Sequence, residues 1–494
     1  MGFKHIPVFY HKCAHATMRP MPKKTRTERD SIGPYQVPAD ALYGIFTARA
    51  LDNFQLSGQN APRVYIQAIG ILKAACAAAN VEVGFLDKKL GGAIEKAAGE
   101  LAEGKFDEEY RIDMIQAGAG TPFNMNANEI IANRANEILG GKRGEYSPIH
   151  PNNHVNMSQS SNDVTPSAIR LAALFLYEPL LREIEALEKS FSKIAAKHKN
   201  LLKVGRTHLE DAVPITVGQE FGAFATQLAK ARERFVRERG ELLELGIGGT
   251  ALGTGINTHP QFQKKVVARL ARITKLPLRP TRDLRETTAS MNNFVAVSNC
   301  CRMLAIDLTK IANDLKLLNM GPLAGLAEIT LPEVEPGSSI MPGKVNPSVA
   351  EAVHIAAYDV MASDHAIALA AQAGQLQLNV MTPLILKHLL SALQLLTNTC
   401  KMFREHCADG IVVNTARIKE LYEGSLVTAT ALNPYIGYEV TAELVKEALK
   451  KKRSILEVVR EKDILAEKDL REVLSPKRTS RPAAVDRKIK AKKA

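Results

Sequence analysis

Residues 297–318 read VSNCCRMLAIDLTKIANDLKLL. Apolar side chains recur along this stretch at alternating steps of four and three residues: Val297, Cys301, Leu304, Leu308, Ile311, Leu315 and Leu318. Such spacing keeps one apolar stripe on the same side of an α-helix, where it can face a partner helix. The stretch therefore predicts a long helix that packs lengthwise against others.

Four more stretches carry a similar signal. Two of them continue the steps of four and three, at Leu180, Ile184, Leu187, Phe191 and Ile194, and at Val217, Phe221, Phe224, Leu228, Ala231 and Phe235. The other two, residues 349–373 and 384–408, are rich in Ala and Leu. Strand signals are sparse. We predict an all-α fold built around a bundle of five helices, each of about 25 residues.

The predicted domain order follows from where Gly, Pro and charge interrupt these helices. Residues 25–160 form an N-terminal helical domain, residues 161–415 the bundle, and residues 416–474 a small C-terminal helical domain. Residues 1–24 are expected to be a basic extension, with Met21 as an alternative start. Residues 475–494, rich in Pro, Lys and Arg, are expected to be disordered.

Charge is concentrated at the two ends of the chain. The 494 residues carry a net charge of +13, yet residues 1–24 hold five basic residues and no acid, and residues 475–494 hold eight basic residues and one acid. The rest of the chain has a net charge of only +1. Nucleic acid is therefore not expected as the main partner, although the basic tails leave polyanion binding open.

Cysteine spacing and hydropathy exclude several classes of protein. The six cysteines form no CxxC pair and no metal-ligand spacing with His, so we expect no disulfide framework, no metal site and a reducing, cytoplasmic compartment. No apolar run approaches the ~20 residues of a membrane-spanning helix, so no membrane is expected. The Gly-rich run at residues 246–255 lacks the flanking strand and acid of a dinucleotide site. No cofactor is expected.

Four polar islands interrupt the helical pattern, and backbone N–H groups at helix ends are free to bind ligands. The islands are residues 118–121 (GAGT), 158–163 (SQSSND), 205–208 (GRTH) and 337–347 (GSSIMPGKVNP). In the last, two hydroxyls, an ammonium and an amide could converge on a small anion. From chemistry alone, a Gly/Pro loop with capping serines and a solvated Lys344 is an equally good interpretation.

The run at residues 337–347 closely resembles the signature of the fumarase/aspartase superfamily, and the other islands resemble that family's substrate-binding regions in the same order. The resemblance covers roughly residues 25–474. It implies a three-domain lyase whose long central helices assemble into the core of a homotetramer, with active sites built from three subunits. It also implies a small dicarboxylate substrate and no metal or organic cofactor.

Reactions of this superfamily remove a proton next to a carboxylate and expel a group from the neighbouring carbon, which leaves fumarate. The resemblance assigns the proton abstraction to Ser338, although chemistry alone favours His208, because histidine is the usual acid–base group near neutral pH. It places His208, with Thr207 and Asn162, beside the leaving group.

The same resemblance assigns other residues to the two substrate carboxylates. One carboxylate becomes a doubly charged aci-carboxylate and needs preorganised donors. The hydroxyls implied there are those of Thr121, Ser160, Ser161 and Ser339; the two neighbouring serines could also cap a helix. Lys344 and Asn346 are implied at the second carboxylate, and Met341 is expected in the substrate pocket.

Short stretches of sequence distinguish the two main activities of the superfamily. Residues 43–44 (YG), 144–146 (GEY), 211–216, 218–223 and 373–376 (AGQL) resemble aspartases, whereas residues 132–135 (ANRA) and 160–161 (SS) resemble fumarases. The expected activity is deamination of L-aspartate to fumarate and ammonia. Hydration of fumarate to L-malate is the alternative, and a non-catalytic relative with polyanion-binding tails is a third.

Overall fold

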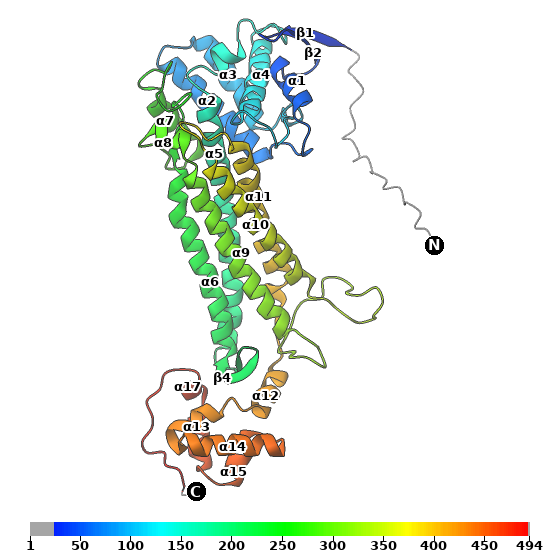
Figure 1. Cartoon of the computed structure of the whole chain (residues 1–494), viewed down its shortest axis with the longest axis vertical. Coiled ribbons are helices and arrows are strands. Elements are labelled where there is room, and N and C mark those ends of the chain that lie inside the picture. The colour runs from blue at the N-terminus through cyan, green and yellow to red at the C-terminus, as the bar shows by residue number, and fades with distance from the viewer. Residues whose placement is uncertain (1–23, 493–494) are drawn as a thin grey trace, which may run out of the picture. The chain divides into compact units, whose positions relative to one another are not determined.

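The computed structural model describes residues 24–492 and consists mainly of α-helices (Figure 1). The predicted all-α fold is confirmed. The strands in the described part are short and form four two-stranded sheets. The pairs are β1 (Thr25–Arg29) with β2 (Pro34–Pro38), β3 (Leu202–Thr207) with β4 (Glu210–Thr216), β5 (Glu244–Leu245) with β6 (Arg279–Pro280), and β7 (Ile329–Thr330) with β8 (Val412–Val413).

All five predicted long helices are present (Figure 1). They are α5 (Ser161–Lys197), α6 (Val217–Glu238), α9 (Asn292–Leu318), α10 (Ser348–Gln372) and α11 (Thr382–His406). Every apolar residue of the predicted seams on α6 and α9 is buried, and on α5 only Ile194 is partly exposed. The spacing of apolar residues therefore identified the buried face of these three helices correctly.

The chain divides into two compact units, and α5, α9, α10 and α11 contribute residues to both. The first unit contains most of the N-terminal half together with residues 238–299 and 363–393. Its shorter helices are α1 (Ile45–Asn53), α2 (Arg63–Glu82), α3 (Lys88–Ala102), α4 (Thr121–Ile138), α7 (Phe262–Thr274) and α8 (Leu284–Ala289), with single turns at Asp107–Glu109, Pro151–Val155 and Arg239–Leu242.

The second unit contains residues 178–237, 300–362 and the chain from residue 394 onward. Aromatic rings join three helices in its core: the Phe191 ring centroid lies 5.8 Å from that of Phe224 and 6.2 Å from that of Phe403. Its smaller helices are α12 (Thr415–Gly424), α13 (Ala429–Ile436), α14 (Tyr438–Lys451), α15 (Ile455–Glu461), α16 (Glu467–Val473) and α17 (Pro476–Thr479), with one turn at Ala408–Gly410. The three-domain division stays a prediction, because each unit combines several segments.

Two helices among residues 24–492, α2 and α5, are long and apolar enough to cross a membrane by composition alone. Within the protein, 72% of the apolar window of α2 and 78% of that of α5 is buried. Their apolar side chains are thus largely covered by other parts of this chain. A core helix meets the same length and composition criteria.

The structure tests the prediction for only one of the two basic tails. The expected extension at residues 1–24 lies outside the described residues, apart from Lys24. The expectation of disorder at residues 475–494 is wrong for residues 475–492, because this segment contains α17 and packs on the C-terminal helices. Ile489 is buried among the apolar residues of α14 and α15, and Lys492 Nζ lies 2.7 Å from Asp463 Oδ1.

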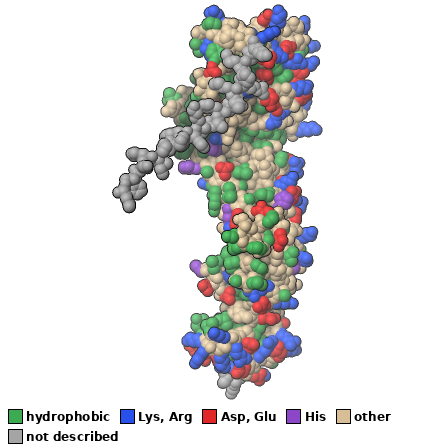
Figure 2. All heavy atoms as spheres, turned by 90° about the vertical axis from the view of Figure 1, so that its right-hand side faces the viewer, with side chains coloured by type: hydrophobic (Ala, Val, Ile, Leu, Met, Phe, Trp, Pro, Cys, Tyr) green, Lys and Arg blue, Asp and Glu red, His purple; other side chains and the backbone are tan. Residues whose placement is uncertain are grey.

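The composition of this segment predicted disorder wrongly, because one buried apolar residue and a few ion pairs with acidic side chains fix a basic segment on the neighbouring helices. Arg478 pairs with Glu472 at 2.9 Å and donates to the Ala484 carbonyl. Basic and acidic side chains are interspersed on the part of the surface that these helices form (Figure 2). The positive charge of the tail is therefore partly neutralised by neighbouring carboxylates.

Replacing Ile489 by Asp should loosen the C-terminal helices, whereas Lys490→Asp, at the exposed neighbouring position, should not. Burying a side chain of this size contributes about 2 kcal/mol, so amide hydrogen exchange in α14 and α15 should become at least about tenfold faster in Ile489→Asp. Hydrogen-exchange mass spectrometry measures this. Equal exchange in both variants would contradict the packing of the tail.

Candidate active site

The first two polar islands lie at the starts of two helices of the first unit. Thr121 opens α4 after a turn in which residues 118–120 all have left-handed φ angles, and its hydroxyl donates to the Gly118 carbonyl at 2.6 Å. Ser160, Ser161 and Asn162 lie at the start of α5. The islands touch, because the Asn124 amide nitrogen of α4 donates to Ser161 Oγ at 3.0 Å.

Asp163 fixes the chain around the second island. One of its oxygens accepts the Ser160 N–H at 2.9 Å, and the other accepts the N–H groups of Gly248 and Thr250 at 3.0 and 2.8 Å. Burial raises the pKa of Asp163 to about 7. The Gly-rich run at residues 246–255 is therefore a packing segment for the start of α5, and Asn162 also donates to its Ala251 carbonyl.

Sequence reasoning missed the buried Lys73 of α2, which lies beneath the second island. Lys73 is 0% exposed, and its ammonium donates to Asn156 Oδ1 at 3.1 Å and to Gln159 Oε1 at 2.8 Å. Burial lowers the pKa of Lys73 to about 7. The available signal was a single lysine within the apolar run of residues 65–79, since a buried charge needs polar partners.

The third island forms the tip of the β3–β4 hairpin in the second unit. Thr207 and His208 are exposed there, and His208 has a left-handed φ of 58°. At the base of the hairpin, the buried Lys203 lies 2.7 Å from the buried Glu328 and 2.8 Å from Glu220. Arg206 donates to the same Glu328 at 2.8 Å. This buried ion network anchors the hairpin whose tip carries the two residues.

The signature run forms a loop before α10, also in the second unit. Ser338 Oγ accepts the N–H groups of Ile340 at 3.3 Å and Met341 at 3.0 Å. A Cβ at Gly337 would lie 2.2 Å from the Lys344 carbonyl oxygen, so only glycine allows the two arms of the loop to approach this closely. The Asn346 amide donates to the Gly337 carbonyl across the same closure. Ser339, Met341 and Lys344 are exposed.

The predicted site residues thus fall into two groups. Thr121, Ser160, Ser161 and Asn162 lie together in the first unit. The hairpin residues Thr207 and His208 and the loop residues Ser338, Ser339, Met341, Lys344 and Asn346 belong to the second. Hydroxyls and amides dominate the first group, and the second adds an ammonium and an imidazole. The donors of each group are of the kinds that bind carboxylates.

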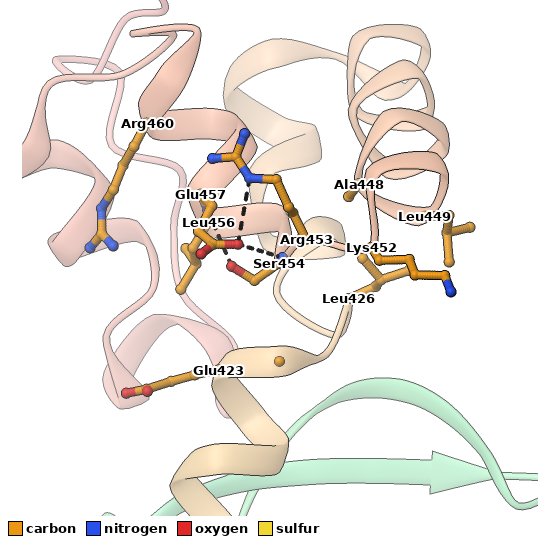
Figure 3. A pocket seen from close by; sticks show the side chains of 11 residues that line it. Glu423, Leu426, Ala448, Leu449, Lys452, Arg453, Ser454, Leu456, Glu457 and Arg460 are labelled. Carbon is orange, nitrogen blue, oxygen red and sulfur yellow. Dashed lines mark hydrogen bonds and ion pairs between the residues drawn. The ribbon is translucent and has the colours of Figure 1, made fainter.

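Other parts of the described chain offer little competing chemistry. No group of three His, Cys, Asp or Glu side chains suited to a metal ion occurs among residues 24–492. A cavity of about 770 Å³ lies among α12, α14 and α15 (Figure 3). Its arginines already have acidic partners: Arg453 pairs with Glu457 and Glu461, and Arg460 with Glu467. None of the predicted site residues lines it.

Comparisons with known proteins identify the family of the chain. A family model described as lyase matches residues 33–362, and one described as fumarase C C-terminus matches residues 428–479. The chain belongs to this lyase family. It is thereby a member of the fumarase/aspartase superfamily, as the sequence motifs predicted.

Its relatives include aspartate ammonia-lyases and class II fumarate hydratases. The chain is 48% identical to aspartate ammonia-lyase of Pseudomonas aeruginosa, over 93% of this chain and 98% of that one, and 43% identical to the Bacillus subtilis enzyme, over 94% and 98%. It is 46% identical to class II fumarate hydratase of Nitrosomonas europaea, over 86% and 92%.

A solved structure from Brucella melitensis, described as fumarate lyase:delta crystallin bound to cobalt, is 42% identical, with a TM-score of 0.90 over 93% of this chain and 100% of that one. The protein is therefore a lyase.

Lys73 provides a pH test of the buried network. Between a pKa of about 7 in the folded protein and 10.5 in the unfolded chain, only the unfolded chain keeps this proton. The free energy of unfolding from this group therefore rises by about 1.4 kcal/mol per pH unit in that window and is constant below it. The melting temperature of the wild type minus that of Lys73→Met should increase from pH 7 to roughly pH 9. A constant difference would contradict the assigned burial.

Proposed function

We propose that the protein is an aspartate ammonia-lyase, which converts L-aspartate to fumarate and ammonia. Ser338 Oγ takes the proton from the carbon next to one carboxylate, and the electron pair left behind forms the aci-carboxylate. Its collapse expels the amine from the neighbouring carbon and forms the double bond of fumarate. The carbon–nitrogen bond breaks with its electron pair remaining on nitrogen, so the ammonium group of the substrate leaves as ammonia and needs no further proton.

The hydrogen bonds that Ser338 accepts support its proposed role as the base. A serine hydroxyl is a weak base and abstracts a proton only as the alkoxide. Two backbone N–H groups already donate to its oxygen, and such donors favour the negatively charged form. The close backbone approach at Gly337 holds these donors in place. Lys344, in the same loop, adds positive charge.

The other site residues then have distinct roles. Thr121, Ser160, Ser161 and Ser339 donate to the carboxylate that gains charge, where each preorganised donor is worth a few kcal/mol. Lys344 and Asn346 bind the second carboxylate, beside Met341. Asn162, Thr207 and His208 surround the amine, and the amide oxygen of Asn162 supplies an acceptor that an ammonium requires.

The resemblance of two stretches to aspartases supports carbon–nitrogen over carbon–oxygen cleavage, and the structure shows that the two stretches are in contact. Two aspartase-like stretches, residues 43–44 and 144–146, meet in the first unit: a Cβ at Gly44 would lie 1.8 Å from the Tyr146 hydroxyl oxygen. The Gly44 N–H donates to the buried Glu129, and the Tyr146 hydroxyl donates to the buried Glu28. Gly44 and Tyr146 thus depend on each other, which makes them one shared feature instead of two chance matches.

The alternative is a class II fumarate hydratase, favoured by the Ser160-Ser161 pair and by relatives of nearly equal identity. We further propose a cytoplasmic homotetramer with active sites shared among three subunits. This arrangement would explain why the predicted residues fall into two groups that belong to different units.

Fumarate absorbs ultraviolet light, so one assay compares both substrates. With purified protein, kcat/KM for L-aspartate should exceed that for L-malate by at least about 100-fold, because the site presents acceptors to an ammonium. The reverse reaction should consume fumarate only when ammonium is added. Turnover of L-malate alone would refute the proposal in favour of a fumarate hydratase.

A further inference from the structure

A chain of buried hydrogen bonds runs from α2 to the start of α5, within the first unit. Lys73 Nζ lies 3.1 Å from Asn156 Oδ1. The same oxygen accepts from Asn124 Nδ2 at 3.1 Å, and Asn124 Nδ2 lies 3.0 Å from Ser161 Oγ. Lys73, Asn124 and Ser161 are all buried. The contacts connect an ammonium group to a serine of the proposed carboxylate site.

Two contacts of Asn156 decide the direction of the hydrogen bonds in this chain. Its amide nitrogen donates to the Gln159 carbonyl at 3.2 Å, so its side-chain oxygen faces Lys73, which donates to it. That oxygen can only accept, so Asn124 must turn its amide nitrogen toward it. The same nitrogen donates to Ser161 Oγ. Ser161 therefore accepts on this side, and its own proton is free to point elsewhere.

Asn124 keeps this orientation at a cost. Its side-chain oxygen is buried and has no hydrogen-bond partner among residues 24–492. Leaving a buried acceptor unsatisfied destabilises the folded state, because the acceptor loses its hydrogen bonds to water. Rotating the Asn124 amide by 180° would not help, because the Asn124 oxygen would then face the Asn156 oxygen and two acceptors would repel each other. The network thus retains a donor toward Ser161 despite the unsatisfied group.

We propose that Lys73 is a positioning residue which, through Asn156 and Asn124, orients the Ser161 hydroxyl to donate its proton to a carboxylate of the substrate. The inference rests on the proposed function, in which Ser161 binds the carboxylate that becomes the aci-carboxylate. A hydroxyl that is oriented in advance stabilises the developing charge without reorganising at the moment of reaction. Lys73 itself acts at a distance, through two amides.

Asn128 offers a matched control for Asn124. It lies one turn further along α4, is equally buried, and donates to the same Asn156 oxygen at 3.2 Å. Its amide nitrogen also contacts Met125 Sδ and not Ser161. A purely structural role of the network predicts similar effects at both positions. An orienting role predicts an effect on catalysis at Asn124 alone.

The test compares Asn124→Asp with Asn128→Ala, which removes one donor to Asn156 and adds no charge. A carboxylate at position 124 accepts the Ser161 proton and so reverses the hydrogen bond. We expect kcat to fall at least about 100-fold in Asn124→Asp with KM changed less than about fivefold, and to stay within about fivefold of wild type in Asn128→Ala. Lys73→Met should lower kcat at least about tenfold. Asn124→Ala, which adds no charge, replaces the first variant if that one does not fold, with an expected loss of about tenfold.

Thermal unfolding and size-exclusion chromatography check that the variants fold and assemble. Equal losses at positions 124 and 128, or unchanged kcat in Lys73→Met, would overturn the inference. Each variant is assayed with whichever dicarboxylate the wild type converts, so activity on L-malate alone refutes the proposed function and leaves this test intact. If the wild type converts neither, calorimetry of fumarate binding decides: Asn124→Asp should bind about threefold more weakly than Asn128→Ala, and equal affinities overturn the inference.

Discussion

A long helix satisfies its own backbone hydrogen bonds everywhere except at its ends, and this constraint governs where the protein can do chemistry. The five long helices bury apolar seams, so their middles have little room for polar groups. Polar side chains consequently gather where a helix begins or two helices connect. Thr121 opens α4, Ser161 opens α5, the Thr207–His208 tip precedes α6, and the signature loop precedes α10. The bundle provides rigid supports, and the connections supply the donors.

The periodic part of the fold could be predicted from the sequence, because burial imposes the spacing of apolar residues on each helix. The seam from Val297 to Leu318 is buried throughout. The positions of the polar islands could also be predicted, since glycine and proline mark the connections between helices. The function of the islands could not be predicted from residue chemistry, because a Gly/Pro loop with serines suits both a binding site and a capped turn. The resemblance of the eleven residues from Gly337 to Pro347 favours the binding site, which stays a prediction.

What the sequence could not reveal were contacts between residues far apart in the chain. Lys73 is separated from Asn156 by 83 residues, and its role depends on which amides surround it in the fold. Asp163 resembles a helix-capping acid, yet it also accepts N–H groups from residues 248 and 250. The predicted disorder of the basic C-terminal segment was wrong for the same reason. Composition alone does not show that Ile489 packs among apolar side chains or that Lys492 pairs with Asp463.

We propose that the two groups of polar residues form one active site shared between subunits. Mixing two inactive variants tests it most directly. Ser161→Ala disables the first group and Ser338→Ala the second, so each alone should be inactive. Co-expressed subunits should combine intact groups from different chains and recover about a quarter of wild-type activity with L-aspartate, as random assembly predicts. Activity no greater than that of the separate variants would contradict a shared site.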